Sequence, residues 1–169
     1  MRPSPSPMPN PSASELEKED GAFLIETARE AIEARLKRRS PHWPKPEEAR
    51  RAALESPCGA FVTLRSGKGP GAPLRGCIGR MNSDESLLEV IREMAQAAAF
   101  EDPRFPPLNE SEYPQVSVAI TVLTPMRPIA RVEEIEIGKH GVYLTKGFRQ
   151  AVFLPQVAPE QGWDRTELL

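Results

Sequence analysis

Proline placement limits this chain to short, frequently interrupted elements. Five of its nineteen prolines alternate through the first eleven residues, and the other fourteen are spread over the remaining 158. Proline lacks a backbone N–H and disfavours helix at the residue before it, so each such position tends to end a helix or a strand. Residues 1–14 offer no periodic apolar face, and we predict a disordered tail there. Residues 15–169 then form the folded domain.

Composition and charge narrow the class of protein. Of the 169 residues, 39% are hydrophobic and 27% charged, which suffices for a hydrophobic core. The net charge is −2, so we expect no nucleic-acid partner. No apolar run is long enough to cross a membrane, and the N-terminus lacks the apolar stretch of a secretory signal. We therefore predict a cytoplasmic protein without a membrane partner, whose two cysteines are reduced.

Apolar spacing and capping residues predict three helices. The first begins near Ser14, which forms a capping box with Glu17. The second spans residues 47–55, and the third begins at Ser83 and continues to about Phe100. The residues predicted to face the core are Leu24, Ala28, Ile32 and Leu36 in the first helix and Leu87, Leu88, Ile91, Ala95 and Ala98 in the third.

Short apolar runs predict the strands. Residues 61–64 and 74–80 are separated by a glycine-rich loop, and residues 116–123 alternate along their whole length. Residues 141–154 are typical of a hairpin that turns at Lys146 and Gly147. Helices and strands follow one another without a regular βαβ alternation. The sequence therefore predicts an α+β fold, a mostly antiparallel sheet with flanking helices.

The segment Leu74-Arg75-Gly76-Cys77-Ile78-Gly79-Arg80 is unusual for a strand. Glycine is disfavoured inside strands, and Gly76 and Gly79 on either side of Cys77 indicate a bulge or a close backbone approach. A neighbouring arginine such as Arg75 favours a reactive thiolate, which would make Cys77 a candidate catalytic residue. The alternative is a buried structural cysteine, because free cysteine is among the most buried residue types.

Two further segments carry candidate site residues. Asp102 and Arg104 flank a proline, so a carboxylate and a guanidinium lie on a rigid loop that serves either recognition or local structure. His140 lies between glycines and is either a base for Cys77 or an exposed turn residue. The histidines and cysteines do not have zinc-finger spacing, and no residue pattern favours a metal site. No phosphate-loop or dinucleotide motif is present. The residues identify no cofactor.

In several separate segments between about residues 20 and 169 the chain resembles one family, the AMMECR-type domain. The family takes its name from a chromosomal region of the AMME syndrome, and its prokaryotic members are called AmmeMemoRadiSam system protein A. Its hallmark is the hexapeptide Leu74-Arg75-Gly76-Cys77-Ile78-Gly79. The other similar segments are residues 61–64, 98–107, 116–118, 138–141, 153–157 and 162–164.

The resemblance carries expectations about fold and partners. It implies an α+β domain of two unequal lobes that share a sheet, and it implies no established activity. It implies that the motif around Cys77 is the functional site, and that a Memo-like protein and a radical SAM protein are the partners. Members of the family usually continue beyond the Gly-Trp-Asp segment. Because the capping box of Asp164 and Glu167 stands just before the last two residues, we expect that a C-terminal segment is lacking.

Two hypotheses about function follow. The first is an accessory binding module, with predicted binding residues Arg75, Gly76, Gly79, Asp102 and Arg104. The second is an enzyme that uses Cys77 as nucleophile or redox centre, assisted by His140 or Asp102. The sequence supplies a thiol but no evident base, so we prefer the binding module.

Overall fold

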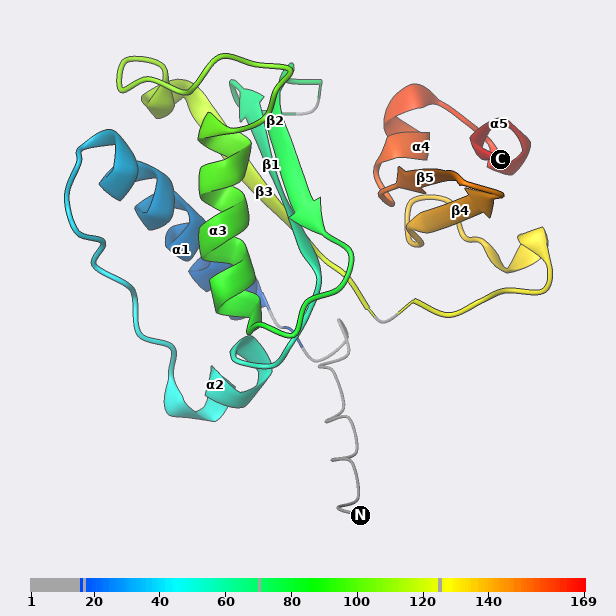
Figure 1. Ribbon diagram of the computed structural model, residues 1–169, viewed down its shortest axis with the longest axis horizontal. Coiled ribbons are helices and arrows are strands. Elements are labelled where there is room, and N and C mark those ends of the chain that lie inside the picture. The colour runs from blue at the N-terminus through cyan, green and yellow to red at the C-terminus, as the bar shows by residue number, and fades with distance from the viewer. Residues whose placement is uncertain (1–15, 17, 70, 125) are drawn as a thin grey trace. The chain divides into compact units, whose positions relative to one another are not determined.

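A computed structural model of the chain describes Leu16 and residues 18–69, 71–124 and 126–169 (Figure 1). Within it the chain forms two compact units, one that ends at Pro125 and one that begins at Met126. The tail predicted for residues 1–14 lies outside the described residues, as does the predicted capping box of the first helix.

An antiparallel sheet of three strands is the centre of the first unit. β1 (Ala60–Ser66) lies between β2 (Leu74–Arg80) and β3 (Val116–Val122), so that the strand order is β2-β1-β3. The three strand predictions are confirmed with small shifts at the ends. Since β1 is central, the register places Thr63 opposite both Cys77 on β2 and Ala119 on β3.

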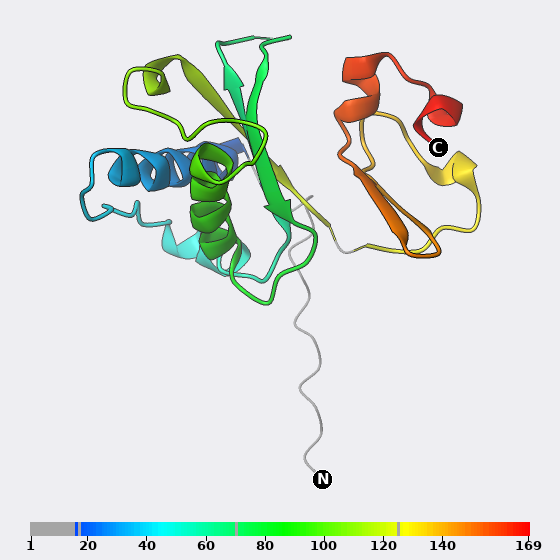
Figure 2. The same cartoon turned by 45° about the horizontal axis from the view of Figure 1, so that its top comes forward.

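Helices cover one face of this sheet. α1 (Lys18–Leu36) and α3 (Leu87–Phe100) lie side by side on it, while α2 (Glu48–Leu54) leads into β1 and the short η1 (Tyr113–Gln115) into β3 (Figures 1 and 2). The predicted apolar faces of the two long helices are confirmed, because their residues form the core together with β1. Fully buried members of this core include Leu24, Ala28, Ile32, Val62, Leu64, Leu87, Ile91 and Ala95.

The third helix begins later than predicted. Ser86 is its N-cap: the Ser86 hydroxyl accepts a hydrogen bond from the Glu89 N–H, and the Glu89 carboxylate accepts one from the Ser86 N–H. Ser83 belongs to the preceding turn, where its hydroxyl accepts from the Glu85 N–H at 3.0 Å. Only Ser86 has a glutamate three residues ahead, and this reciprocal pairing makes it the stronger helix start.

The second unit has a hairpin and short helical turns. η2 (Val132–Glu134) precedes β4 (Val142–Lys146) and β5 (Arg149–Phe153), which pair antiparallel as predicted. α4 (Val157–Gln161) and α5 (Arg165–Leu168) follow. Its core consists of Ile135, Val142, Ala158 and Leu168, with Leu144, Phe153 and Trp163 partly buried against them.

The capping box predicted near the chain end is present. The Asp164 carboxylate accepts hydrogen bonds from the N–H groups of Thr166 and Glu167, and the Glu167 carboxylate accepts one from the Asp164 N–H. The four-residue α5 that it starts buries Leu168. Trp163, just before the box, lies edge-on to Phe153 with ring centroids 6.3 Å apart.

The predicted α+β fold with antiparallel pairing and flanking helices is confirmed. The expectation of one sheet shared by two lobes is wrong, because the described strands pair only within their own unit. Prolines at positions 125 and 128 lie between β3 and β4, and proline lacks the N–H that a continuous ladder needs. None of the helices in the described residues is long and apolar enough to cross a membrane.

Candidate functional site

Cys77 lies at the middle of β2, on the face of the sheet opposite α1 and α3. Val62 and Leu64 of β1 are fully buried beneath α3. Since side chains alternate between the two faces of a strand, Thr63 points the other way, and so does Cys77 opposite it. The Thr63 hydroxyl lies 3.3 Å from Cys77 Sγ. The Cys77 side chain is half-buried, so its thiol is neither sealed in the core nor fully exposed.

The backbone of Cys77 is bonded by the loop after α3. Its N–H donates to Asp102 Oδ2 at 2.9 Å, and its carbonyl accepts from Arg104 Nη2 at 3.2 Å. The two side chains thereby satisfy the outer N–H and C=O of an edge-strand residue, as a neighbouring strand would. We call this pair of side chains the Asp102–Arg104 clip.

Asp102 is the most strongly held carboxylate of this region. Its side chain is 2% exposed and accepts four hydrogen bonds, one from the Cys77 N–H and three from the Arg104 N–H, Nε and Nη2. The Arg104 guanidinium, followed by these backbone donors, outweighs desolvation and holds the pKa of Asp102 far below its usual range. The same contact raises the pKa of Arg104. Asp102 is therefore an anion held in place and a poor proton acceptor.

Close packing explains the two glycines of the hexapeptide. A Cβ at Gly76 would lie 2.1 Å from the carbonyl oxygen of Ala98, so only glycine lets α3 approach β2 this closely. A Cβ at Gly79 would lie 2.2 Å from the ring of Phe61, which leans across from β1. The close backbone approach predicted from the sequence is thus confirmed, and both glycines shape the strand that carries Cys77.

Arg75 ties β2 to the segment after the clip. Its side chain is almost fully buried, bonds both carboxylate oxygens of Glu112 and donates to the carbonyl of Pro106 at 2.8 Å. Both guanidiniums lie near the ring of Phe105, that of Arg75 at 5.8 Å and that of Arg104 at 5.5 Å from its centre. Arg75 therefore positions the loop, and a ligand-binding role for it stays a prediction.

His140 belongs to the second unit, whereas the other predicted site residues belong to the first. Its Nδ1 accepts a hydrogen bond from the Glu136 N–H at 3.2 Å, and its own N–H donates to the Glu136 carbonyl at 3.0 Å. These bonds close the turn before β4, for which Gly138 adopts a positive φ of 82°. The pairing of His140 with Cys77 stays a prediction.

The second cysteine has no features of a reactive site. Cys58 is 1% exposed, and its Sγ donates to the Leu123 carbonyl at 3.1 Å. Burial raises the pKa of this thiol, which keeps it protonated at neutral pH.

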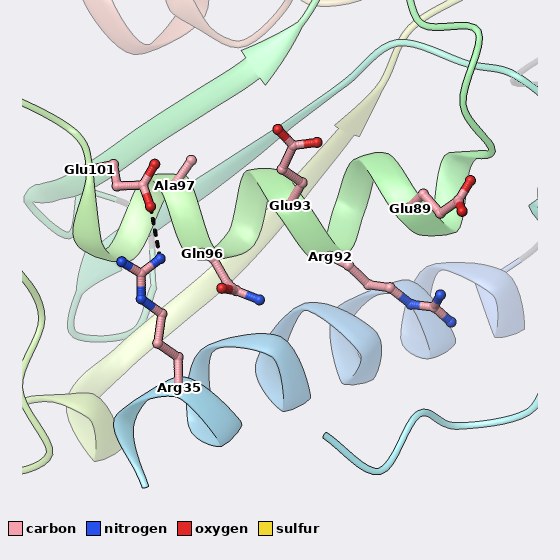
Figure 3. A pocket seen from close by; sticks show the side chains of 7 residues that line it. All are labelled: Arg35, Glu89, Arg92, Glu93, Gln96, Ala97 and Glu101. Carbon is pink, nitrogen blue, oxygen red and sulfur yellow. Dashed lines mark hydrogen bonds and ion pairs between the residues drawn. The ribbon is translucent and has the colours of Figure 1, made fainter. Parts of the chain in front are cut away.

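A hollow between α1 and α3 lies apart from the predicted residues (Figure 3). Arg35 pairs with Glu101 at 2.8 Å. The Arg92 guanidinium stacks 4.4 Å from the Trp43 ring centre, and its buried Nε has no hydrogen-bond partner among the described residues. The residues that line it are Arg35, Glu89, Arg92, Glu93, Gln96, Ala97 and Glu101. The described residues contain no group of three His, Cys, Asp or Glu side chains placed to hold a metal ion.

Three residues that shape the site were not predicted: Thr63, Phe105 and Glu112. Thr63 contacts the thiol because of the register between β1 and β2, and Glu112 meets Arg75 across 37 residues of sequence. Such long-range pairs leave no local pattern. Of these three residues, only Phe105 is adjacent in the sequence to a predicted site residue, because it directly follows Arg104.

The chain is therefore an α+β protein of two units, with a half-buried strand thiol whose backbone is held by an aspartate–arginine clip. The sequence profile of the AMMECR1 family matches residues 25–169, and the chain belongs to this family.

Its relatives include archaeal proteins. Protein MK0488 of Methanopyrus kandleri is 41% identical over 158 residues, which cover 89% of this chain and 74% of that protein. A protein of Thermococcus gammatolerans is 39% identical over 91% of this chain and 77% of its own length. The crystal structure of the uncharacterised protein PH0010 from Pyrococcus horikoshii is similar with a TM-score of 0.80 and 37% identity, and covers 91% of this chain and 78% of that one.

Proposed function

We propose that this chain is an accessory binding protein and that the sheet face around Cys77, opposite α1 and α3 and with Arg104 beside it, is its recognition surface. The observation that carries the proposal is the state of Asp102. All four of its hydrogen bonds are made within the chain, and its pKa is far below neutrality. Asp102 is therefore a poor acceptor for the proton of a thiol, and its place is to hold the strand and Arg104 in position.

Arg104 supplies the charged part of this surface. Its side chain is 54% exposed although it bonds both Asp102 and the Cys77 carbonyl. A guanidinium held in a fixed orientation suits a carboxylate of a partner protein, because its planar donors match the two oxygens. Gly79 on the same strand leaves room for the Phe61 ring, so its part in the recognition surface is to let that ring cover the strand.

A Memo-like protein and a radical SAM protein are the partners we propose, on the strength of the family to which the chain belongs. In this proposal the chain presents or recognises a component of that system and performs no chemistry itself. The proposed place of action is the cytoplasm.

Co-purification tests the proposal. The tagged chain is mixed with the Memo-like and radical SAM proteins of the same organism, and captured protein is quantified for the parent, Arg104→Gln and Cys77→Ser. We expect Arg104→Gln to lose capture and Cys77→Ser to keep it. Arg127→Gln is the matched control, because Arg127 is another exposed arginine in an ion pair. Equal capture by Arg104→Gln and the control would overturn the proposal.

An enzyme that uses Cys77 as nucleophile or redox centre is the second candidate. It is favoured by one observation: the Arg104 guanidinium, bonded to the Cys77 carbonyl, places a positive charge beside a half-buried thiol. Mass analysis of the reconstituted system separates the two candidates. A modified product that disappears with Cys77→Ser while capture persists would establish the enzyme, and unchanged products would exclude it.

A further inference from the structure

The hollow between α1 and α3 has a volume of about 320 Å³, which is enough for a small ligand (Figure 3). All the residues that line it belong to the first unit. Those that α3 contributes are not among the buried residues of that helix, so they lie on its side away from the core. The hollow therefore lies within one unit, and it shares no residue with the Asp102–Arg104 clip.

The carboxylates that line the hollow already have donors within the first unit. The pairs are Glu89 with Ser86, Glu93 with Arg80, and Glu101 with Arg35. Figure 3 also shows the Glu93 side chain pointing away from α1, on the other side of α3 from Arg92. The negative charges around the hollow are thus compensated, and so is the positive charge of Arg35.

Arg92 is held differently. Among the residues that the structure describes, it has no hydrogen-bond or ion-pair partner, and its buried Nε–H is unsatisfied. Its guanidinium stacks instead 4.4 Å from the ring centre of Trp43, which is itself partly buried against the core. Burial lowers the pKa of Arg92, yet an arginine keeps its charge at neutral pH. A partly dehydrated cation without a counter-charge favours the binding of an anion.

The arrangement around Arg92 suits a carboxylate. The Trp43 ring fixes the plane of the guanidinium, and of its nitrogens Nε is the buried one, so the two terminal amino groups are open to a ligand. Two parallel N–H donors match the two oxygens of a carboxylate. Gln96 lies one helical turn further along α3, and Figure 3 shows its amide on the same side of the helix as Arg92. Ala97, with its short side chain, leaves the space beside them open.

We propose that this hollow binds one carboxylate group, carried by a small molecule or by an acidic side chain of a peptide. The two terminal amino groups of Arg92 bond its two oxygens, and the Gln96 amide donates to one of them. A phosphate or a dicarboxylate fits less well, because Glu89 and Glu101 repel a second negative charge. This site is separate from the surface around Arg104.

Benzoate is the probe for a small carboxylate, and benzamide, which has the same shape without the charge, is its control. Saturation-transfer NMR measures the binding of each to the full chain. We expect benzoate to bind saturably and benzamide to show no binding. Arg92→Gln should weaken benzoate binding at least about tenfold, because a charged double hydrogen bond is lost. Arg35→Gln is the matched control in the same hollow and should weaken it less than about threefold, since Arg35 is already paired. Equal losses in the two variants, or equal binding of benzamide, would overturn the proposal.

The fluorescence of Trp43 locates the probe without a change at Arg92. In a Trp163→Phe background Trp43 is the one tryptophan left. Benzoate on Arg92 alters the charge stacked on this ring, so the emission should change with the same concentration dependence as the NMR signal. Benzamide should leave it unchanged. An emission that does not respond at saturating benzoate contradicts the assigned site.

Two capped peptides separate the sources of the carboxylate. Acetyl-Ala-Glu-Ala-amide carries an acidic side chain, and acetyl-Ala-Gln-Ala-amide is its neutral control. Binding of the glutamate peptide but not the glutamine peptide identifies an acidic side chain, and binding of benzoate alone identifies a small molecule. If neither probe binds, the proposal is wrong. If Arg104→Gln loses benzoate and Arg92→Gln keeps it, the carboxylate belongs to the recognition surface of the proposed function, and the present inference fails while that function stands.

Discussion

Replacing Asp102 by asparagine tests the clip most directly. Asparagine keeps the size of the side chain but removes its charge. The N–H groups of Cys77 and Arg104 then lose a charged acceptor, at about 1 kcal/mol each. The ion pair with the half-exposed Arg104 side chain contributes less than about 1 kcal/mol. We expect Asp102→Asn to lower the free energy of unfolding of the first unit by about 2–3 kcal/mol at pH 7.

The effect has a defined pH dependence. The pKa of folded Asp102 lies below its unfolded value, so its stabilisation is complete above an unfolded pKa of about 3.9 and is lost as the pH falls toward the folded pKa. The difference between parent and Asp102→Asn should therefore be constant from pH 7 to about pH 5 and shrink below pH 4. Glu30, whose pKa Arg39 lowers to about 2, is present in both proteins and does not affect the difference.

Urea unfolding with fluorescence detection measures this difference. The chain has two tryptophans, Trp43 in the first unit and Trp163 in the second, so a Trp163→Phe background reports on the first unit alone. Asp84→Asn, an exposed aspartate before α3, is the matched control and should change stability by less than about 0.5 kcal/mol. If Asp102→Asn lowers the free energy of unfolding by no more than about 0.5 kcal/mol at pH 7, the role given to the clip is refuted. A difference between the two proteins that persists unchanged to pH 3 would refute it as well.

Other parts of the structure give further predictions. Gly76→Ala should lower the free energy of unfolding by about 2–3 kcal/mol, and with it the melting temperature, because the new Cβ meets a helix carbonyl. Gly21→Ala, on the exposed surface of α1, should instead raise the free energy of unfolding by about 0.5–1 kcal/mol. Ser86→Ala should destabilise by about 1 kcal/mol in urea unfolding and Ser83→Ala by clearly less; equal effects would contradict the assigned cap. Native protein should take up one equivalent of iodoacetamide at Cys77, and the buried second cysteine should react only in urea; the reverse order would contradict the observed burial.

Much of the fold could be predicted because its signals are local. The alternation over residues 116–123 and the apolar spacing in the two long helices each need only a few neighbouring residues. The predicted start of α3 was wrong because Ser83 and Ser86 are both possible N-cap residues. Only Ser86 has a glutamate at the third position after it, and Ser86 is the N-cap in the structure. The hairpin pairing was predicted, but the division of the strands into two sheets was not, since a proline-rich segment between two strands does not show whether they share a sheet.

In the candidate site, too, contacts between neighbouring residues could be predicted and long-range contacts could not. Asp102 and Arg104 are two residues apart, and their mutual pairing was one of the alternatives open from the sequence. That the pair holds the backbone of Cys77, 25 residues earlier in the chain, depends on how α3 lies across β2. Gly76 permits that approach. From the sequence, this glycine indicated a bulge or a close backbone approach but not which segment comes close.

The clip on β2 also protects this edge of the sheet from pairing with another chain. A sheet with two open edges can add copies without end, which is the route to fibres. Here Asp102 and Arg104 already bond the outward N–H and C=O of Cys77, at the middle of the edge strand β2. A strand of another chain therefore finds these two backbone groups occupied. Loss of Asp102 would free the Cys77 N–H and leave this part of the edge available to a strand of another chain.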